Sequence, residues 1–156
     1  MIAAMESHRS SAVVQRRLID SLYLEAMVLA DEARGYFDDG GRGERAVLDP
    51  MARVVFSCES LKITTRLMHV VAWLLTQRAV ETGEMTADAA RDPARVLGPA
   101  PRTDDAVLAA MPGGARALAV ASIDLYRRVE WIERAHDGPP PASPARAMFD
   151  RLSLAL

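Results

Sequence analysis

The longest regular pattern of apolar and polar positions runs over residues 50–82. A first row of apolar or small residues steps alternately by four and three, the spacing by which one helix packs along another. Its members are Val54, Cys58, Leu61, Thr65, Met68, Ala72, Leu75 and Ala79. Asp49 can cap the helix, Pro50 fits its first position, and Gly83 can take the left-handed conformation that ends it. The pattern therefore predicts one helix over 50–82.

A second row lies on a neighbouring face of this predicted helix. It consists of Phe56, Ile63, Leu67, Val70 and Leu74. The polar residues are confined to a narrow strip, formed by Glu59, Lys62, Arg66, His69 and Thr76. One partner helix cannot cover both rows. We therefore expect this helix to contact two neighbours in its own chain, or one neighbour and a second subunit.

The same helical period recurs on either side of the central stretch. Over 11–37 the repeating residues are Ile19, Leu22, Ala26, Leu29, Ala33 and Tyr36. Over 115–136 they are Leu118, Ser122, Leu125, Val129 and Ile132. Residues 1–10 are expected to form a loose arm. Residues 38–43 (DDGGRG) are expected to form a turn, since each glycine in a helix costs about 1 kcal/mol relative to alanine.

These elements predict an all-α fold, an antiparallel three-helix bundle over residues 1–138. The connection between the second and third helices is long and is interrupted by proline and glycine, and its order stays open. The sequence after it, 139–156, begins with a proline spacer and ends in a short amphipathic piece. We expect this segment to be a flexible C-terminal tail.

Composition and charge exclude several classes of function. The net charge is −2 and the basic residues are interspersed with acidic ones, so we expect no positively charged surface that would bind nucleic acid. Cys58 is the only cysteine, which rules out an internal disulfide and predicts a buried, inert thiol. The N-terminus lacks the apolar core of a secretory signal, and the run Leu67–Leu75 is about half a membrane span. We therefore expect a cytoplasmic protein without membrane insertion.

No group of residues predicts catalysis, a metal site or a bound cofactor. Glu133 and His136 have the Glu-x-x-His spacing of di-iron bundles, but the second copy that such a site requires is missing. His136 is instead a cation near a helix C-terminus. His69 has no Asp, Ser or Cys at a spacing that would orient it as a base, and it is interpreted as a surface or interface histidine.

Two residue types suggest either core or interface. The eight methionines are interpreted mainly as core filling, with an adaptable binding groove as the alternative. Trp73 and Trp131 lie beside charged residues, where a large aromatic is either the edge of a core or an anchor for a partner. The pattern leaves both interpretations of the tryptophans open.

Two stretches resemble a known family. ESLKITTRLMHVVAWLLTQRAVETGEMT, residues 59–86, resembles the signature helix of the RcdA family, alphaproteobacterial adaptors of regulated proteolysis. SLYLEAMVLADEARGYFDDGGRGERAVL, residues 21–48, is similar to that family's first helix and Gly-rich turn. The resemblance implies a three-helix bundle without catalytic activity that works with the ClpXP protease. It also implies that the adaptor binds a primed protease and helps deliver cell-cycle regulators such as CtrA, with a cyclic-di-GMP-binding co-adaptor.

The matched helix and the tail supply the candidate partner-binding residues. They are Glu59, Arg66, Trp73, Gln77 and Arg78 in the helix, and Phe149, Leu152 and Leu154 in the tail. The tail either contacts the protease or another partner, or docks on its own bundle. The alternative to an adaptor is a structural homodimer or assembly module without a role in proteolysis, built on the second row of the central helix. Recruitment to the cell pole is a further expectation from the resemblance.

Overall fold

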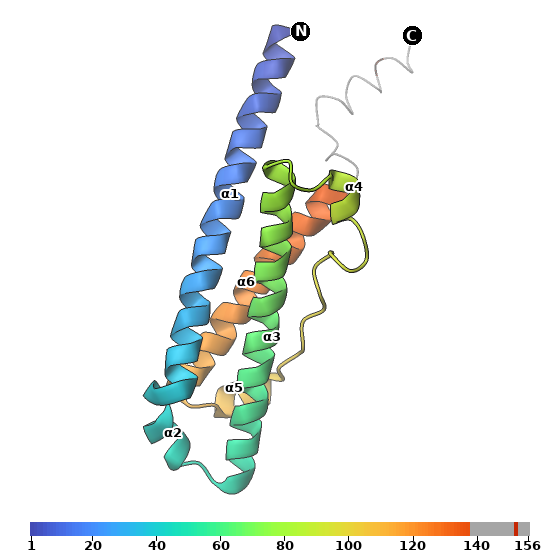
Figure 1. Ribbon diagram of the computed structural model, residues 1–156. Coiled ribbons are helices and arrows are strands. Elements are labelled where there is room, and N and C mark those ends of the chain that lie inside the picture. The colour runs from blue at the N-terminus through green and yellow to red at the C-terminus, as the bar shows by residue number, and fades with distance from the viewer. Residues whose placement is uncertain (138–151, 153–156) are drawn as a thin grey trace.

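The computed structural model describes residues 1–137 and residue 152. Three long helices, α1 (Ile2–Gly35), α3 (Pro50–Glu81) and α6 (Gly113–Asp137), lie along one another (Figure 1). Short elements connect them: the π-helical turn η1 (Tyr36–Gly40) and the helices α2 (Arg42–Ala46), α4 (Ala87–Ala90) and α5 (Asp105–Ala110). The described residues contain no strand, and the all-α prediction is confirmed.

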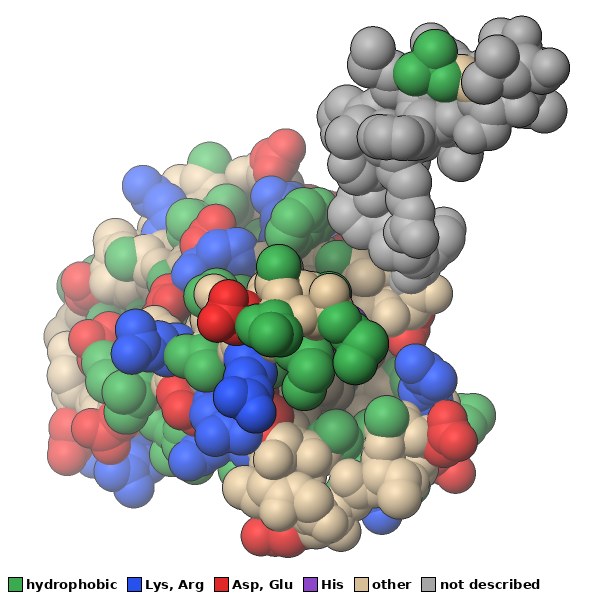
Figure 2. All heavy atoms as spheres, turned by 90° about the horizontal axis from the view of Figure 1, so that it is seen from above, with side chains coloured by type: hydrophobic (Ala, Val, Ile, Leu, Met, Phe, Trp, Pro, Cys, Tyr) green, Lys and Arg blue, Asp and Glu red, His purple; other side chains and the backbone are tan. Residues whose placement is uncertain are grey.

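Helix α1 is longer than predicted. It begins at Ile2, so the expected loose arm over residues 1–10 is wrong. No glycine or proline interrupts the chain before Gly35, and extending an existing helix costs far less than starting one. The first turns of α1 extend beyond the ends of α3 and α6 (Figure 1), and residues 1–18 are exposed. Seen from that end of the molecule, hydrophobic side chains are exposed on the surface beside basic ones (Figure 2).

The buried face of α1 is the predicted one, and the same holds for α6. In α1 the buried residues are Ile19, Leu22, Ala26, Leu29 and Ala33. In α6 they include every member of the predicted row, namely Leu118, Ser122, Leu125, Val129 and Ile132. The helical period therefore identified the core-facing side of both outer helices.

The chain reversal between α1 and α3 is helical rather than an open turn. The π-helical turn and α2 occupy most of residues 36–46, where glycines predicted an irregular segment. Gly41 is needed there because a Cβ atom at that position would lie 2.9 Å from the carbonyl oxygen of Tyr36. The Tyr36 hydroxyl donates a hydrogen bond to Glu44 of α2, and the Tyr36 ring packs edge-on against Phe37. This end of the molecule is thereby closed.

Helix α3 has the predicted ends, but residues of its polar strip are buried and most of its first apolar row is exposed. The side chain of Asp49 accepts a hydrogen bond from the Ala52 amide at 2.7 Å, and Gly83 has a φ of 78°. The second row is buried throughout. The first row is largely exposed, Cys58 included, so the prediction of a buried thiol is wrong. Both α1 and α6 pack on α3, and neither covers the first row.

The helix directions differ from the expected antiparallel order. Along α3 and α6 the contacts advance together, from Arg66 with Ser122 to Trp73 with His136. These two helices are therefore parallel, and only α1 runs in the opposite direction (Figure 1). The connection over residues 82–112 makes this arrangement feasible, because it carries the chain back along the bundle before α6 begins.

Candidate interaction surface

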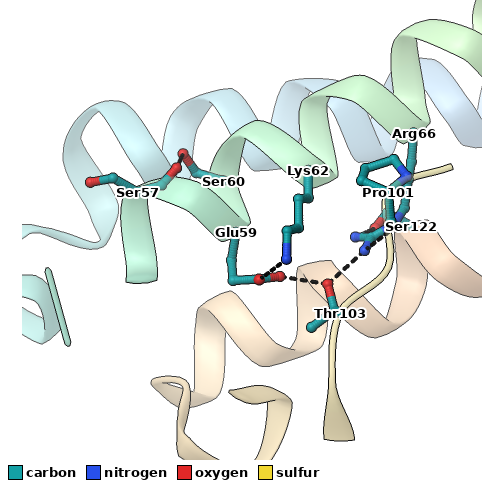
Figure 3. A network of polar contacts seen from close by, with 8 residues as sticks. All are labelled: Ser57, Glu59, Ser60, Lys62, Arg66, Pro101, Thr103 and Ser122. Carbon is teal, nitrogen blue, oxygen red and sulfur yellow. Dashed lines mark hydrogen bonds and ion pairs between the residues drawn. The ribbon is translucent and has the colours of Figure 1, made fainter. Parts of the chain in front are cut away.

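A polar network holds the long connection against α3 and α6 (Figure 3). Arg66 is 1% exposed, and its guanidinium donates to Ser122 Oγ at 3.2 Å. It also donates to the carbonyl oxygen of Pro101 at 3.0 Å and to Thr103 Oγ1 at 2.6 Å. Thr103 in turn donates to Glu59 Oε2 at 2.5 Å, and Lys62 Nζ lies 2.7 Å from Glu59 Oε1. A hydroxyl thus links the two buried charges.

The linker strap, residues 97–103, makes further contacts on the same side of the molecule. The amide of Leu97 donates to Glu133 Oε2 at 2.7 Å, and the Tyr126 hydroxyl donates to the carbonyl oxygen of Gly98 at 2.6 Å. His69 Nδ1 lies 3.0 Å from the carbonyl oxygen of Pro99. The open question of order in this connection is thereby answered: the strap crosses α3 and α6 with its backbone bonded to both.

Burial of Glu59 and Arg66 contradicts the prediction that they face a partner. Desolvation lowers the pKa of Arg66, and the nearby charge of Glu59 partly offsets that effect. The strap covers the polar strip of α3, and the network satisfies the groups that it buries. These two residues, together with the half-buried His69, hold the chain's own connection. The contacts of His69 likewise do not support the predicted surface or interface role.

The other predicted residues of α3 differ in exposure. Trp73 is buried, with its ring centroid 6.1 Å from that of His136, so its interpretation as core is the correct one. Gln77 is half-buried beside it. Arg78 is partly exposed, pairs with Asp20 at 3.5 Å and lies 4.6 Å above the ring of Tyr23. Gln77 and Arg78 thus keep part of their surface, whereas Glu59, Arg66 and Trp73 are buried.

Two of the tail predictions cannot be placed. Phe149 and Leu154 lie outside the described residues, whereas Leu152 is helical and 56% exposed. The partner-binding role of all three therefore stays a prediction.

An apolar groove lies between α1 and α3, on the side that neither the strap nor α6 covers. We call it the α1–α3 groove; its volume is about 610 Å³. Its lining residues are Met27, Ala30, Ala33, Arg34, Phe37, Asp38, Ser60, Thr64, Leu67, Met68, Val71, Ala72 and Leu75. Arg34 and Asp38 are the only charged residues among them, and Arg34 is paired with Asp31. The groove can therefore hold an apolar, uncharged surface.

Three residues of the groove wall on α3, Met68, Ala72 and Leu75, belong to the first row. Met68 is 64% exposed, and Val54, on the same row but six residues before the groove begins at Ser60, is 57% exposed. The sequence did identify this row as a packing surface. Its signal was the regular helical spacing. The prediction placed the partner-binding residues of α3 elsewhere, two on the polar strip (Glu59 and Arg66) and three at Trp73, Gln77 and Arg78.

The methionines also differ from their prediction. Met111 is in the core, whereas Met1, Met5, Met27, Met51 and Met68 are exposed. Met27 and Met68 line the groove from opposite sides. The adaptable binding groove, kept as the alternative to core filling, is thus the better description of these two side chains.

A second hydrophobic surface lies between α1 and α6. Trp131 is 73% exposed and borders a shallow depression of about 370 Å³. The residues around it are Leu18, Leu22, Arg127, Arg128 and Ile132, and we call this surface the Trp131 patch. Arg128 is bonded to Glu25 and pairs with Asp124 at 3.0 Å. Of the two tryptophans, Trp73 therefore belongs to the core and Trp131 to the surface.

Other kinds of site have no counterpart in the part of the chain that is described. Residues 1–137 and 152 contain no group of three His, Cys, Asp or Glu side chains placed to hold a metal ion. No helix among these residues combines the length and apolar character needed to cross a membrane. Two apolar surfaces, the α1–α3 groove and the Trp131 patch, are therefore considered as contact sites.

Comparisons with known proteins identify related chains. Residues 10–156 match the family described as "Protein of unknown function (DUF1465)". The fold is similar to the crystal structure of RcdA from Caulobacter crescentus CB15, with a TM-score of 0.61 and 37% sequence identity. That similarity covers 75% of this chain and 88% of the RcdA chain. No curated protein matches the sequence.

Proposed function

We propose an adaptor function from one premise: the chain belongs to the DUF1465 family of RcdA-like proteins. In this proposal the protein has no catalytic role and helps to deliver substrate proteins to the ClpXP protease. The cargo would be cell-cycle regulators such as CtrA, and a cyclic-di-GMP-binding co-adaptor would take part, as the resemblance to RcdA implies. The site of action would be the cytoplasm, with recruitment to the cell pole.

An adaptor must hold two proteins close together, because it accelerates a reaction by raising their effective concentration. The observation that carries the proposal is the α1–α3 groove, an exposed apolar surface without a partner in the described chain. Contiguous exposed apolar surfaces of this kind are typical of protein interaction sites. The Trp131 patch is a second contact surface, on the other side of α1.

A reconstituted degradation assay tests this function. Turnover of a CtrA-type substrate by ClpXP and its priming factors is measured with and without the protein. We expect the protein to accelerate turnover, and Met68→Glu to abolish the acceleration by placing a charge in the apolar groove. Val54→Glu is the matched control, since it adds the same charge to the same helix at similar exposure but about 9 Å before the groove begins at Ser60. Substrate turnover that never responds to the protein would remove the basis of the proposal.

A structural homodimer is the second candidate. The second row, which was the predicted surface for this dimer, is buried in the bundle and is not available. The exposed first row favours a dimer instead, because an apolar helix face can pack against the same face of a second copy. Sedimentation measurements would then give a dimer that Met68→Glu converts to a monomer. A dimer of this kind without any effect on degradation would favour the structural role over the adaptor role.

A further inference from the structure

The C-terminal segment and the α1–α3 groove have complementary features. Over residues 148–156 the large apolar residues are Met148, Phe149, Leu152, Leu154 and Leu156. Met148, Leu152 and Leu156 are four residues apart, a spacing that gives one apolar face of a helix. Leu152 is helical in the structure, and its apolar side chain is 56% exposed. The segment therefore needs a surface that can cover this face.

We propose that residues 148–156 bind as a short amphipathic helix in the α1–α3 groove of their own chain. They thereby compete with the partner that the groove takes. The regulatory consequence rests on the proposed function, whereas the binding of the segment does not.

The length of the groove fits this segment. Its wall on α3 extends from Ser60 to Leu75, about 22 Å at 1.5 Å per residue. A helix over residues 148–156 is about 14 Å long by the same measure. The segment is therefore shorter than the groove, which can accommodate its full length.

The connecting chain is long enough to reach the groove. Asp137, the end of α6, lies beside Trp73 and Gln77, where these residues line one small cavity. Met68 is five residues from Trp73 along α3, which is about 8 Å along the helix axis. The route also passes around α3, whose diameter is about 10–12 Å, so the path is about 25 Å. Residues 138–147 span about 33 Å when extended.

The charges are also compatible. The groove contains one cation and one anion, Arg34 and Asp38, and the segment carries one of each, Asp150 and Arg151. A neutral, apolar occupant is therefore favoured over a strongly acidic or basic one. The groove could bind the segment of its own chain or the identical segment of another copy. The segment of the same chain is favoured because it is covalently attached. A tether of about ten residues holds the segment at an effective concentration far above the micromolar concentration of a free chain.

Paramagnetic relaxation in the full-length protein tests this inference. A nitroxide is attached to Cys58, which is exposed and does not line the groove. Cys58 is about 15 Å along the helix axis from Met68. The methyl signals of Met148 and Leu152 are then recorded, and we expect each to lose more than half of its intensity. This loss should not change on tenfold dilution.

Two variants locate the contact. Met68→Glu should restore the signals, whereas Val54→Glu, outside the groove, should leave the loss unchanged. Circular dichroism checks that both variants retain the helix content of the parent chain. A loss of signal that persists in the Met68→Glu variant would place the segment elsewhere and overturn the inference.

A mixed sample separates binding within one chain from binding between two. Spin-labelled chains without isotope label are mixed with isotope-labelled Cys58→Ser chains, and we expect the methyl signals in this mixture to keep their intensity. Losses that appear only in the mixture would mean that a second copy fills the groove. Full intensity in every sample would mean that the segment does not bind. No protease or substrate is present, so failure here leaves the degradation assay to decide the adaptor function separately.

Discussion

Replacement of Arg66 by methionine tests whether the polar network stabilises the fold. Methionine retains much of the apolar length of arginine but removes its charge and three hydrogen bonds, to Ser122, Pro101 and Thr103. The carbonyl oxygen of Pro101 then loses its donor, which costs about 1–3 kcal/mol for a buried group. Glu59 also keeps a buried charge with one fewer cation nearby.

The magnitude follows from two opposing contributions. Removal of one member of a buried charged network typically costs about 3–5 kcal/mol. The substitution also removes the cost of desolvating the Arg66 guanidinium, the effect that lowers its pKa. The expected loss in the free energy of unfolding is therefore near the lower value, about 3 kcal/mol. In a domain of this size, 1 kcal/mol changes the melting temperature by about 2–4 °C. The variant should therefore melt about 6–12 °C below the parent chain.

Urea unfolding followed by circular dichroism measures this loss. Arg78→Met is the matched control, because Arg78 is partly exposed and its pair with Asp20 spans 3.5 Å. It should cost less than about 1 kcal/mol, as exposed ion pairs do. An Arg66→Met variant within about 0.5 kcal/mol of the parent chain, the usual effect of a surface substitution, would refute the structural role of the network.

Three further predictions test other parts of the fold. Leu74→Ala should lower the free energy of unfolding by about 2–5 kcal/mol, since Leu74 is fully buried, and a cost below about 1 kcal/mol in urea unfolding would contradict its place in the core. Gly98→Ala should displace the strap, because its Cβ atom would lie 2.6 Å from His69 Nδ1, and unchanged amide exchange over residues 97–103 would argue against that contact. Burial and the hydrogen bond to Glu44 raise the pKa of Tyr36 from 10.0 to about 12. The stability that its protonated form provides is therefore complete below pH 10 and is lost as the pH rises toward 12. The free energy of unfolding of Tyr36→Phe should therefore depend less on pH in that range. An equal slope in both proteins would contradict the assignment.

Features set by local sequence could be predicted. The ends of α3 followed from Asp49, Pro50 and Gly83, which act on the backbone within one turn of their own position. The buried faces of α1 and α6 followed from a single apolar row on each helix. A helix with one such row has one way to pack, so its orientation needs no knowledge of the rest of the chain.

The orientation of α3 could not be predicted in this way. Its two apolar rows are alternatives of similar character, and the choice between them depends on where the connection over residues 82–112 runs. The groups that satisfy Arg66 are 35, 37 and 56 residues away in the sequence. No local pattern links Thr103 or Ser122 to that arginine. A charged strip is usually exposed, and only the path of the strap makes its burial favourable here.

This exchange of faces changes the forces expected at the candidate site. Binding through Glu59 and Arg66 would have been largely electrostatic, and salt would have weakened it. The α1–α3 groove instead offers Met27, Met68 and Leu75, with little charge around them. Binding there buries apolar surface, which gives a negative heat-capacity change and little dependence on ionic strength. The polar strip is engaged with the strap, so the partner recognition that we propose would rest on apolar contacts in the groove rather than on the charges of the strip.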